Sequence, residues 1–420
     1  MTTTLYGNGL DLDTVTQALK EHYKPLSVKN MVYKDNPFLA LVNKYERFGG
    51  ENMPIPTQFG IANRRSATFT TGQLLGTSTN LARFVITRVK DYSFASITGE
   101  TIKATEGNAD AFLKYATMEI DGAIQSLTRS IAVGLYGDGT GKLGDIKSGG
   151  LPVNTNGTGR LLTLENAESV TNFEVGMVLK FVQSVAHAPR ADTYTITAVD
   201  RDTGILTGTI ASSSGAAADT DFVVQDGDYV AAGGDADGNR MKISGLEAWI
   251  PSGTPANLFG VTRTADRTRL AGVPFNGASM PIEEALIGAA SRLAREGGSP
   301  THCFMDYTQF SNLEKALGSK VVYDKVSSDD ADVGFQSLTI IGPKGPIQIV
   351  ADQNCTPNVA YMLQMDTWTL NSLGSAPHIL DLDGNRMLRE ANNDAYEVRV
   401  GFYGNLSCNA PGYNSRVALA

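Results

Sequence analysis

The segment from Asn52 to Lys90 contains no aspartate or glutamate, although the chain as a whole holds more acidic than basic residues, 44 against 35. This segment carries five basic residues, Arg64, Arg65, Arg83, Arg88 and Lys90. From Asp192 to Asp237 the balance reverses, with nine aspartates against Arg201 alone. Complementary patches fix how proteins associate, so we expect the basic segment of one copy to contact an acidic surface of another. The alternative is that both stretches are solvated faces.

Residue types that carry chemistry are scarce. The three cysteines, Cys303, Cys355 and Cys408, have neither metal-knuckle nor disulfide-framework spacing, and we expect buried thiols. The four histidines occur outside any HExxH pattern, no GxSxG sequence is present, and each histidine is expected to be structural or superficial. Those histidines are His22, His187, His302 and His378.

Targeting and nucleic-acid signals are also lacking. The first residues have neither the basic start nor the apolar core of a signal peptide, and no apolar run reaches membrane-spanning length. We therefore expect a protein that stays in the cytoplasm where it is made, without a membrane partner. The net charge of −9 disfavours direct binding of DNA, because a phosphate-reading surface needs a basic footprint.

Two short motifs resemble ligand loops but fail the test of spacing. Gly137 to Lys142 looks like a phosphate loop, yet its first glycine is missing, Leu143 replaces Ser or Thr, and it follows a helix. Asp381 to Asn385 begins like a calcium loop, but its glycine comes two positions early. No enzyme, metal or cofactor is predicted, and the alternative of a soluble hydrolase with a dispersed active site stays open.

The first half of the chain alternates short helices with extended segments. Helices are predicted at residues 11–24 and from Pro37, capped by Asn36, to Gly49. Strands from Met53 to Ile61 and from Ala82 to Ile97 flank a Thr, Gly, Ser and Asn tip, which predicts a long two-stranded excursion with too little apolar surface to fold alone. Apolar positions at helical spacing then predict one long helix over residues 108–136.

The second half of the chain contains a run of short strands followed by alternating helices and strands. Five short strands at 160–164, 177–182, 193–199, 205–210 and 222–224 predict a small barrel or sandwich, between glycine-rich linkers at 144–157 and 233–238. Helices at 281–296 and 307–317 then alternate with apolar strands at 303–305, 338–341, 347–351 and 361–363. Strands at 395–403 and 416–420 close the chain, and Trp249 and Trp368 are expected in the core.

With these elements in order, the chain resembles the major capsid proteins of tailed bacteriophages, whose shell fold is shared by encapsulins and the herpesvirus capsid floor. The tract Gly345-Pro346-Ile347-Gln348-Ile349-Val350-Ala351-Asp352 with Tyr361-Met362-Leu363 resembles the family's apical strand pair. The ending from Tyr396 to Leu406 resembles its final strand. An encapsulin-like compartment is the alternative within the same fold.

The resemblance implies an α+β shell fold and a division of the chain. The expected parts are an N-terminal arm (1–50), an extended loop (51–100), a spine helix of the peripheral domain (101–145), an inserted barrel-like β domain (146–245), an apical α/β domain (246–385) and closing peripheral strands (386–420). It further implies hexamers and pentamers of an icosahedral virion capsid enclosing double-stranded DNA without specific binding. A separate scaffolding protein, a portal and a decoration protein are the implied partners, and Arg64, Arg65, Arg83, Arg88 and Lys90 are the expected inter-subunit contacts.

Overall fold

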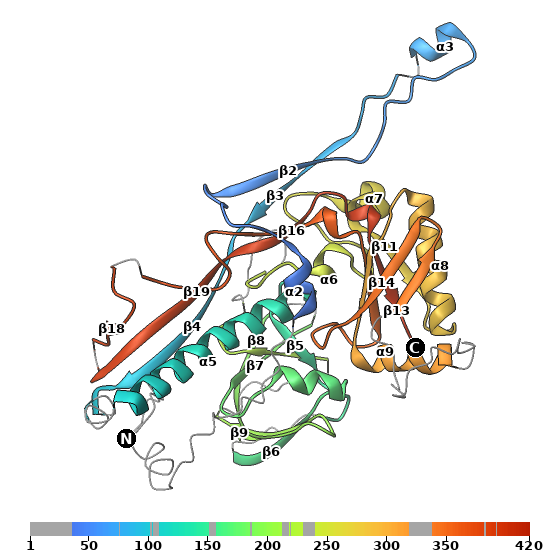
Figure 1. The fold of residues 1–420 in the computed structure, drawn as a ribbon. Helices are drawn as coiled ribbons and strands as arrows, with labels where there is room; N and C mark the ends of the chain where they lie inside the picture. Colours follow the sequence, from blue (N-terminus) through green and yellow to red (C-terminus); the bar gives the residue numbers. More distant parts are fainter. Residues whose placement is uncertain are drawn as a thin grey trace, which may run out of the picture. The chain divides into compact units, whose positions relative to one another are not determined.

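The computed structural model describes most of the chain in two compact units (Figure 1). The smaller unit draws its described residues from Lys90–Ile131 and Ser372–Tyr403, and the larger from Asn36–Val89, Ala132–Asn371 and Gly404–Ala420. The helix predicted at 11–24 lies outside the described residues. Those are 36–74, 76–100, 103, 109–150, 157–184, 187–211, 218, 220–229, 240–318, 338–381, 384–391 and 393–420.

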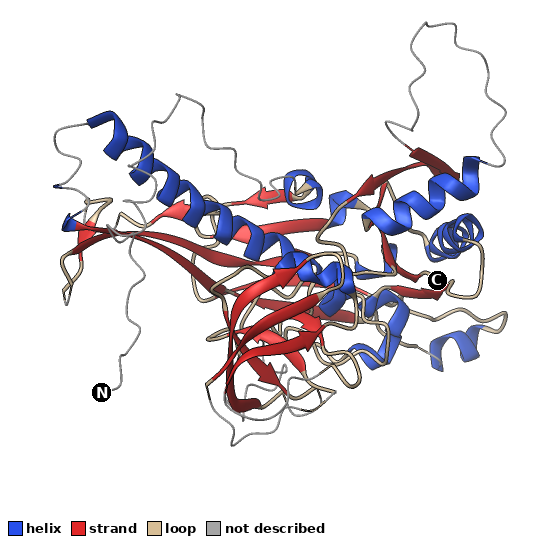
Figure 2. Cartoon of the chain, turned by 90° about the horizontal axis from the view of Figure 1, so that it is seen from below, coloured by secondary structure: helices blue, strands red, loops and turns tan. Residues whose placement is uncertain are grey.

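The smaller unit is built from a long helix and a sheet centred on one strand. The strand β19 (Ala395–Cys408) pairs with β4 (Val89–Thr98), β17 (His378–Ile379) and β18 (Leu388–Arg389). Helix α5 (Ala109–Tyr136) runs along β4 and β19 (Figures 1 and 2), and its position confirms the predicted long helix. The Ser130 hydroxyl donates to Asp91 Oδ2 at 2.6 Å, so Asp91 lies on the helix-covered face of β4.

The larger unit contains a six-stranded mixed sheet with two helices packed on one face. Helices α8 (Ile282–Glu296) and α9 (Tyr307–Gly318) agree with the predicted helices. Leu286 and Leu293 pack with alternate strand residues such as Cys303 and Met362 in one apolar cluster. The strand order is β11 (Val273–Asn276), β20 (Ser415–Ala418), β15 (Val359–Leu363), β12 (His302–Met305), β14 (Gly345–Ala351) and β13 (Leu338–Gly342).

The last strand differs from the expectation that 386–420 closes the peripheral region. β20 is parallel to β11, with Val273 opposite Ser415, and antiparallel to β15, with Tyr361 opposite Arg416. Val417 is fully buried in the cluster beneath α8. Strand β20 therefore belongs to the sheet of β11 to β15, because both of its edges are paired there.

The predicted β module is a closed six-stranded barrel with its own apolar core. Its order is β5 (Lys142–Asp145), β10 (Phe222–Gln225), β7 (Val178–Val182), β8 (Pro189–Asp200), β9 (Ile205–Ile210) and β6 (Gly157–Thr163). An antiparallel bridge between Ile146 and Leu164 joins the two outer strands, and a turn η1 (Ala167–Asn172) lies between β6 and β7. The expected linker at 144–157 thus begins inside the barrel, because β5 pairs with β10.

The helix predicted from Pro37 is shorter than expected. Helix α2 (Pro37–Leu41) begins at the proline as predicted but ends before β1 (Asn43–Tyr45), which lies parallel to β16 (Trp368–Ser372). Asn36 makes no side-chain cap, and its Oδ1 instead accepts a hydrogen bond from the Asn354 side-chain amide at 2.9 Å. Pairing with a strand more than three hundred residues away therefore overrides the local helical pattern.

The larger unit also contains several short helical elements. They are α6 (Leu246–Trp249), η2 (Arg263–Asp266), α7 (Arg267–Ala271), η3 (Met365–Thr367) and η4 (Pro411–Tyr413). Trp249 and Trp368 are fully buried with ring centroids 6.3 Å apart, which confirms them as core residues. The three cysteines are buried free thiols, as predicted.

Candidate functional site: the extended hairpin

The acid-free segment forms an antiparallel hairpin that projects from the larger unit (Figure 1). Strands β2 (Asn52–Gln58) and β3 (Leu81–Thr87) pair along seven positions, from Asn52 opposite Thr87 to Gln58 opposite Leu81. A single helical turn, α3 (Phe69–Leu74), lies at the tip. The predicted strand pair is confirmed, but the second strand divides into β3 and β4 at Arg88.

The root of the hairpin is part of the core. Phe84 and Ile86 are fully buried, and the Phe84 ring lies 5.0 Å from that of Trp249. The Val85 backbone amide donates to the Phe259 carbonyl at 3.0 Å, and the Asn405 side-chain amide donates to the Thr87 carbonyl at 3.0 Å. The hairpin is therefore fixed at its base by packing and by hydrogen bonds to its backbone.

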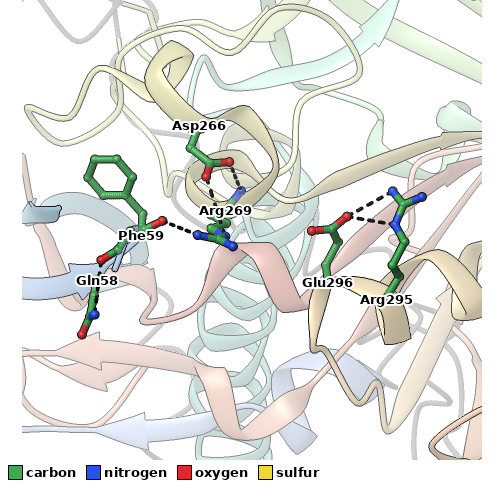
Figure 3. A network of polar contacts seen from close by, with 7 residues as sticks. Gln58, Phe59, Asp266, Arg269, Arg295 and Glu296 are labelled. Carbon is green, nitrogen blue, oxygen red and sulfur yellow. Dashed lines mark hydrogen bonds and ion pairs between the residues drawn. The ribbon is translucent and has the colours of Figure 1, made fainter. Parts of the chain in front are cut away.

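A second anchor holds the point where the strands end. Arg269 Nη1 donates to the Phe59 carbonyl at 2.7 Å (Figure 3). Asp266 orients this guanidinium, with Oδ2 3.7 Å from Arg269 Nε, while its Oδ1 accepts the Arg269 amide at the start of α7. Beyond Phe59 the two sides of the tip are held mainly to each other, by bonds such as that between the Asn63 amide and Thr77 Oγ1 at 2.9 Å.

The tip exposes large apolar side chains. The exposed fractions are 78% for Ile61, 78% for Phe69, 85% for Leu74 and 69% for Leu81. Such residues were not singled out from the sequence, because they are separated by Thr, Gly, Ser and Asn without a helix or strand period. Apolar surface is stabilised when it leaves water, by about 25 cal/mol per Å². The tip is thus suited to burial against another surface.

The five predicted contact residues differ in their exposure and in their partners within the chain. Arg64, Arg65 and Arg83 are exposed on the hairpin, with no polar side-chain partner among the described residues. Arg88 is half-buried: its Nη1 donates to the Phe48 carbonyl at 2.8 Å, and its guanidinium carbon lies 5.2 Å from the centre of the Phe48 ring. Lys90 is exposed in the smaller unit. The structure therefore brings together three of the five on the hairpin and gives Arg88 an intrachain role.

The acidic stretch presents less negative surface than its composition indicates. Asp221 is buried and accepts two hydrogen bonds from Arg190, at 2.8 and 3.1 Å. Asp228 pairs with Lys242 at 2.9 Å, and Asp192 is also buried. Asp219, Asp235 and Asp237 lie outside the described residues, and Asp200, Asp202 and Asp226 are exposed. Sequence counting missed these pairings because Arg190 and Lys242 lie outside the counted window.

The histidines in the described part of the chain pack against aromatic rings. Ring centroids are 5.9 Å apart for His187 and Phe222, 6.1 Å for His302 and Phe304, and 6.0 Å for His378 and Tyr403. Burial lowers the pKa of His302. Within the described ranges no group of three His, Cys, Asp or Glu side chains is placed to hold a metal ion, and no helix is long and apolar enough to cross a bilayer.

A family model and two of the solved structures that match this chain are those of phage capsids. Residues 219–385 match the family model of the SU10 major capsid protein. The capsid asymmetric unit of cyanophage A-1(L) is similar over 94% of this chain and 95% of its own, with a TM-score of 0.55 and 12% identity. The capsid of the Myoviridae phage XM1 is similar over 96% and 98%, with a TM-score of 0.46 and 8% identity. No curated protein sequence matches the chain. The match to the cyanophage A-1(L) capsid gives this chain the α+β fold of phage capsid shells.

Proposed function

We propose that this chain is a phage major capsid protein, a structural component of the virion, and that it builds an icosahedral head by packing the extended hairpin of each copy onto a neighbouring copy. The observation that carries the proposal is the contrast within the hairpin. Its root is buried and hydrogen-bonded, whereas its tip exposes four large apolar residues and two arginines that have no polar side-chain partner among the described residues.

The contact between copies is expected to be of the head-to-tail kind. A hairpin on one surface and its acceptor on another are different patches, and heterologous contacts of this kind close into rings. We infer hexamers and pentamers as those rings, in agreement with the resemblance that the sequence carries. A copy in a ring both gives a hairpin and receives one, so each exposed tip is covered.

The remaining partners follow from charge and from the barrel. A formal charge of −9 suits a wall that encloses double-stranded DNA without binding it tightly. A scaffolding protein and a portal are proposed for assembly. The closed barrel, with its own core, is a proposed platform for a decoration protein.

Charge reversal at the tip tests the proposal. The variant R64E/R65E should fold as the wild type does but fail to form capsomers, because attraction between copies becomes repulsion. The control K147E/R201E makes the same change of charge at two exposed barrel residues, one of which pairs with Glu174 at the surface, and it should assemble. Circular dichroism would check the fold, and sedimentation velocity with electron microscopy would check assembly. Normal shells from R64E/R65E would overturn the docking role of the hairpin.

A further inference from the structure

The smaller unit carries a row of four aromatic side chains, of which two are exposed and two are half-buried. Successive residues of a strand point to opposite faces, and Asp91 lies on the face of β4 that α5 covers. Tyr92 and Phe94 occupy the other face, where they are 43% and 59% exposed. Large exposed aromatic residues side by side mark a recognition surface more often than an ordinary solvated face.

Four rings form this row, which we call the aromatic ribbon: Phe94, Tyr92, Tyr403 and His378. Phe94 and Tyr92 are stacked with centroids 6.5 Å apart, Tyr92 meets Tyr403 edge to face at 5.7 Å, and Tyr403 meets His378 at 6.0 Å. Burial, with a smaller contribution from the Tyr92 hydroxyl, raises the pKa of Tyr403 to about 12. The four rings are held in place by their contacts with each other.

A carboxylate lies at one end of the ribbon. Ser96 follows Phe94 by two positions and shares its face of β4. Its hydroxyl donates to Glu390 Oε1 at 2.7 Å. Aromatic faces next to a carboxylate suit a cationic and partly apolar partner, because a guanidinium can stack on a ring while it pairs with an acid.

The hairpin tip has the complementary chemistry. It carries Arg64 and Arg65 beside the exposed Phe69 and Leu74, with no acidic residue from Asn52 to Lys90. The chain already uses the same pairing at the hairpin root, where the Arg88 guanidinium lies over the Phe48 ring. Since every copy carries both surfaces, a second copy supplies the partner.

We propose that the hairpin tip of one copy docks on the aromatic ribbon of another, with the guanidinium groups of Arg64 and Arg65 on the rings of Tyr92 and Phe94 and beside Glu390. This assignment rests on the proposed function and names its receiving surface. A nucleic-acid strand is the competing occupant, since bases also stack on exposed rings. The carboxylate at the end of the ribbon and the net negative charge favour the hairpin.

Cross-linking between two differently labelled chains tests the contact directly. Ala67→Cys places a thiol beside the tip arginines, and Lys90→Cys places one on the ribbon face of β4, so all four rings and both arginines remain. The three native thiols are buried and stay out of the reaction. The two single variants are mixed, allowed to assemble and treated with a short bis-maleimide. A dimer-sized product is expected in the mixture.

Two controls test whether the cross-link is specific to the tip and the ribbon. Each single variant alone, and Ala67→Cys mixed with Val175→Cys on the exposed barrel surface, should give at most a trace of that product. A mixture of Ala67→Cys and Lys90→Cys that yields no more product than these controls would overturn the assignment. This outcome is readable even if other ribbon variants fail to fold.

A second comparison separates this proposal from the function on which it rests. The variant Y92A/F94A should raise the protein concentration needed for assembly at least tenfold, whereas Y92F, which keeps the ring, should change it little. Normal assembly of Y92A/F94A together with failure of R64E/R65E would remove the ribbon but keep hairpin docking. Normal assembly of both variants would overturn the role of the ribbon and also hairpin docking. Binding of a fluorescent oligonucleotide that Y92A/F94A abolishes would assign the ribbon to nucleic acid and overturn the proposal.

Discussion

The Tyr136 hydroxyl donates a hydrogen bond to Asp352 Oδ2 at 2.9 Å inside the larger unit, where both residues are buried. The Phe38 amide at the start of α2 donates to the same oxygen at 3.3 Å. The last residue of α5, the first turn of α2 and the end of β14 therefore meet at one carboxylate. Residues far apart in the sequence are joined here by a polar contact within an apolar environment.

Removing the Tyr136 hydroxyl should destabilise the protein. Tyr136→Phe leaves the Asp352 carboxylate short of one donor, and hydrogen bonds to charged groups contribute about 1.5 to 3 kcal/mol. Urea unfolding of the variant should show a loss within that range. Tyr413→Phe removes a hydroxyl from a more exposed tyrosine and should change the unfolding free energy by less than about 0.5 kcal/mol. Equal stabilities of the two variants would contradict the role of the contact.

The barrel offers a matched pair of ion pairs for comparison. Arg190→Met leaves Asp221 buried without its bidentate partner and should cost about 3 kcal/mol, because breaking a buried pair strands a charge. Arg201→Met breaks an exposed pair with Glu174 and should cost less than about 1 kcal/mol. Thermal unfolding of both variants measures the difference. A larger loss from Arg201→Met would mean that Asp221 is not stabilised by Arg190.

Two glycines should respond in opposite ways to alanine. Gly122 lies within α5 with nothing near its missing side chain, so Gly122→Ala should stabilise the fold by about 0.5 to 1 kcal/mol through helix propensity. At Gly245 an added Cβ would lie 2.3 Å from the Leu135 carbonyl oxygen. Gly245→Ala should therefore be strongly destabilising. Denaturant midpoints of both variants check the pair, and a stable Gly245→Ala would refute the close approach.

The free energy of unfolding should decrease as pH rises, partly because two buried thiols ionise more easily in the unfolded chain. Burial raises the pKa of Cys303 and of Cys408 to about 12. A group whose pKa is higher in the folded state stabilises that state fully below its unfolded pKa, near 9 here, and loses the contribution as pH rises toward 12. Each thiol should remove about 1.4 kcal/mol per pH unit in this window. The double variant C303A/C408A should therefore lose stability less steeply between these pH values, as urea unfolding would measure, and an unchanged slope would contradict the argument.

Deleting the barrel should leave the rest of the chain folded if the deletion removes all six barrel strands. The Lys242 amide donates to the Gly139 carbonyl at 3.1 Å, so the two connections to the barrel lie together. Deletion of residues 141–240 should leave a folded host. A cut at about 155–232, which lies between the glycine-rich linkers expected at 144–157 and 233–238, removes β10 but leaves β5 behind, and the trimmed chain should aggregate. Aggregation of the first variant beside a soluble second would show that the barrel boundary is wrong.

The sequence predicts those parts of the fold that repeat a local period. The helix of residues 108–136 agrees closely with α5 because apolar residues such as Leu127 and Leu135 recur on one face and are buried. Strand β8 was found because the buried Tyr194 and Ile196 alternate with threonines. Such patterns are decided by near neighbours.

Features that depend on distant partners were missed. Helix α2 ends early because Asn43 to Tyr45 pair with β16, and the burial of Asp221 depends on Arg190 across the barrel. The basic segment was found by composition, but the exposed Phe69 and Leu74 have no period to mark them. The aromatic ribbon likewise joins residues of three strands, and only the folded sheet brings Tyr92 beside Tyr403.

Electron microscopy of the full chain beside a chain with a shortened hairpin tests the central claim most directly. The Phe59 and Gly60 amides both donate to the Asn80 carbonyl, so residues 61–79 can be removed by joining Gly60 to Asn80 across this closure. We predict closed shells from the full chain, expressed with its scaffolding protein where one is needed, and folded but unassembled subunits from the shortened chain. Closed shells of normal size from the shortened chain would contradict assembly through the hairpin.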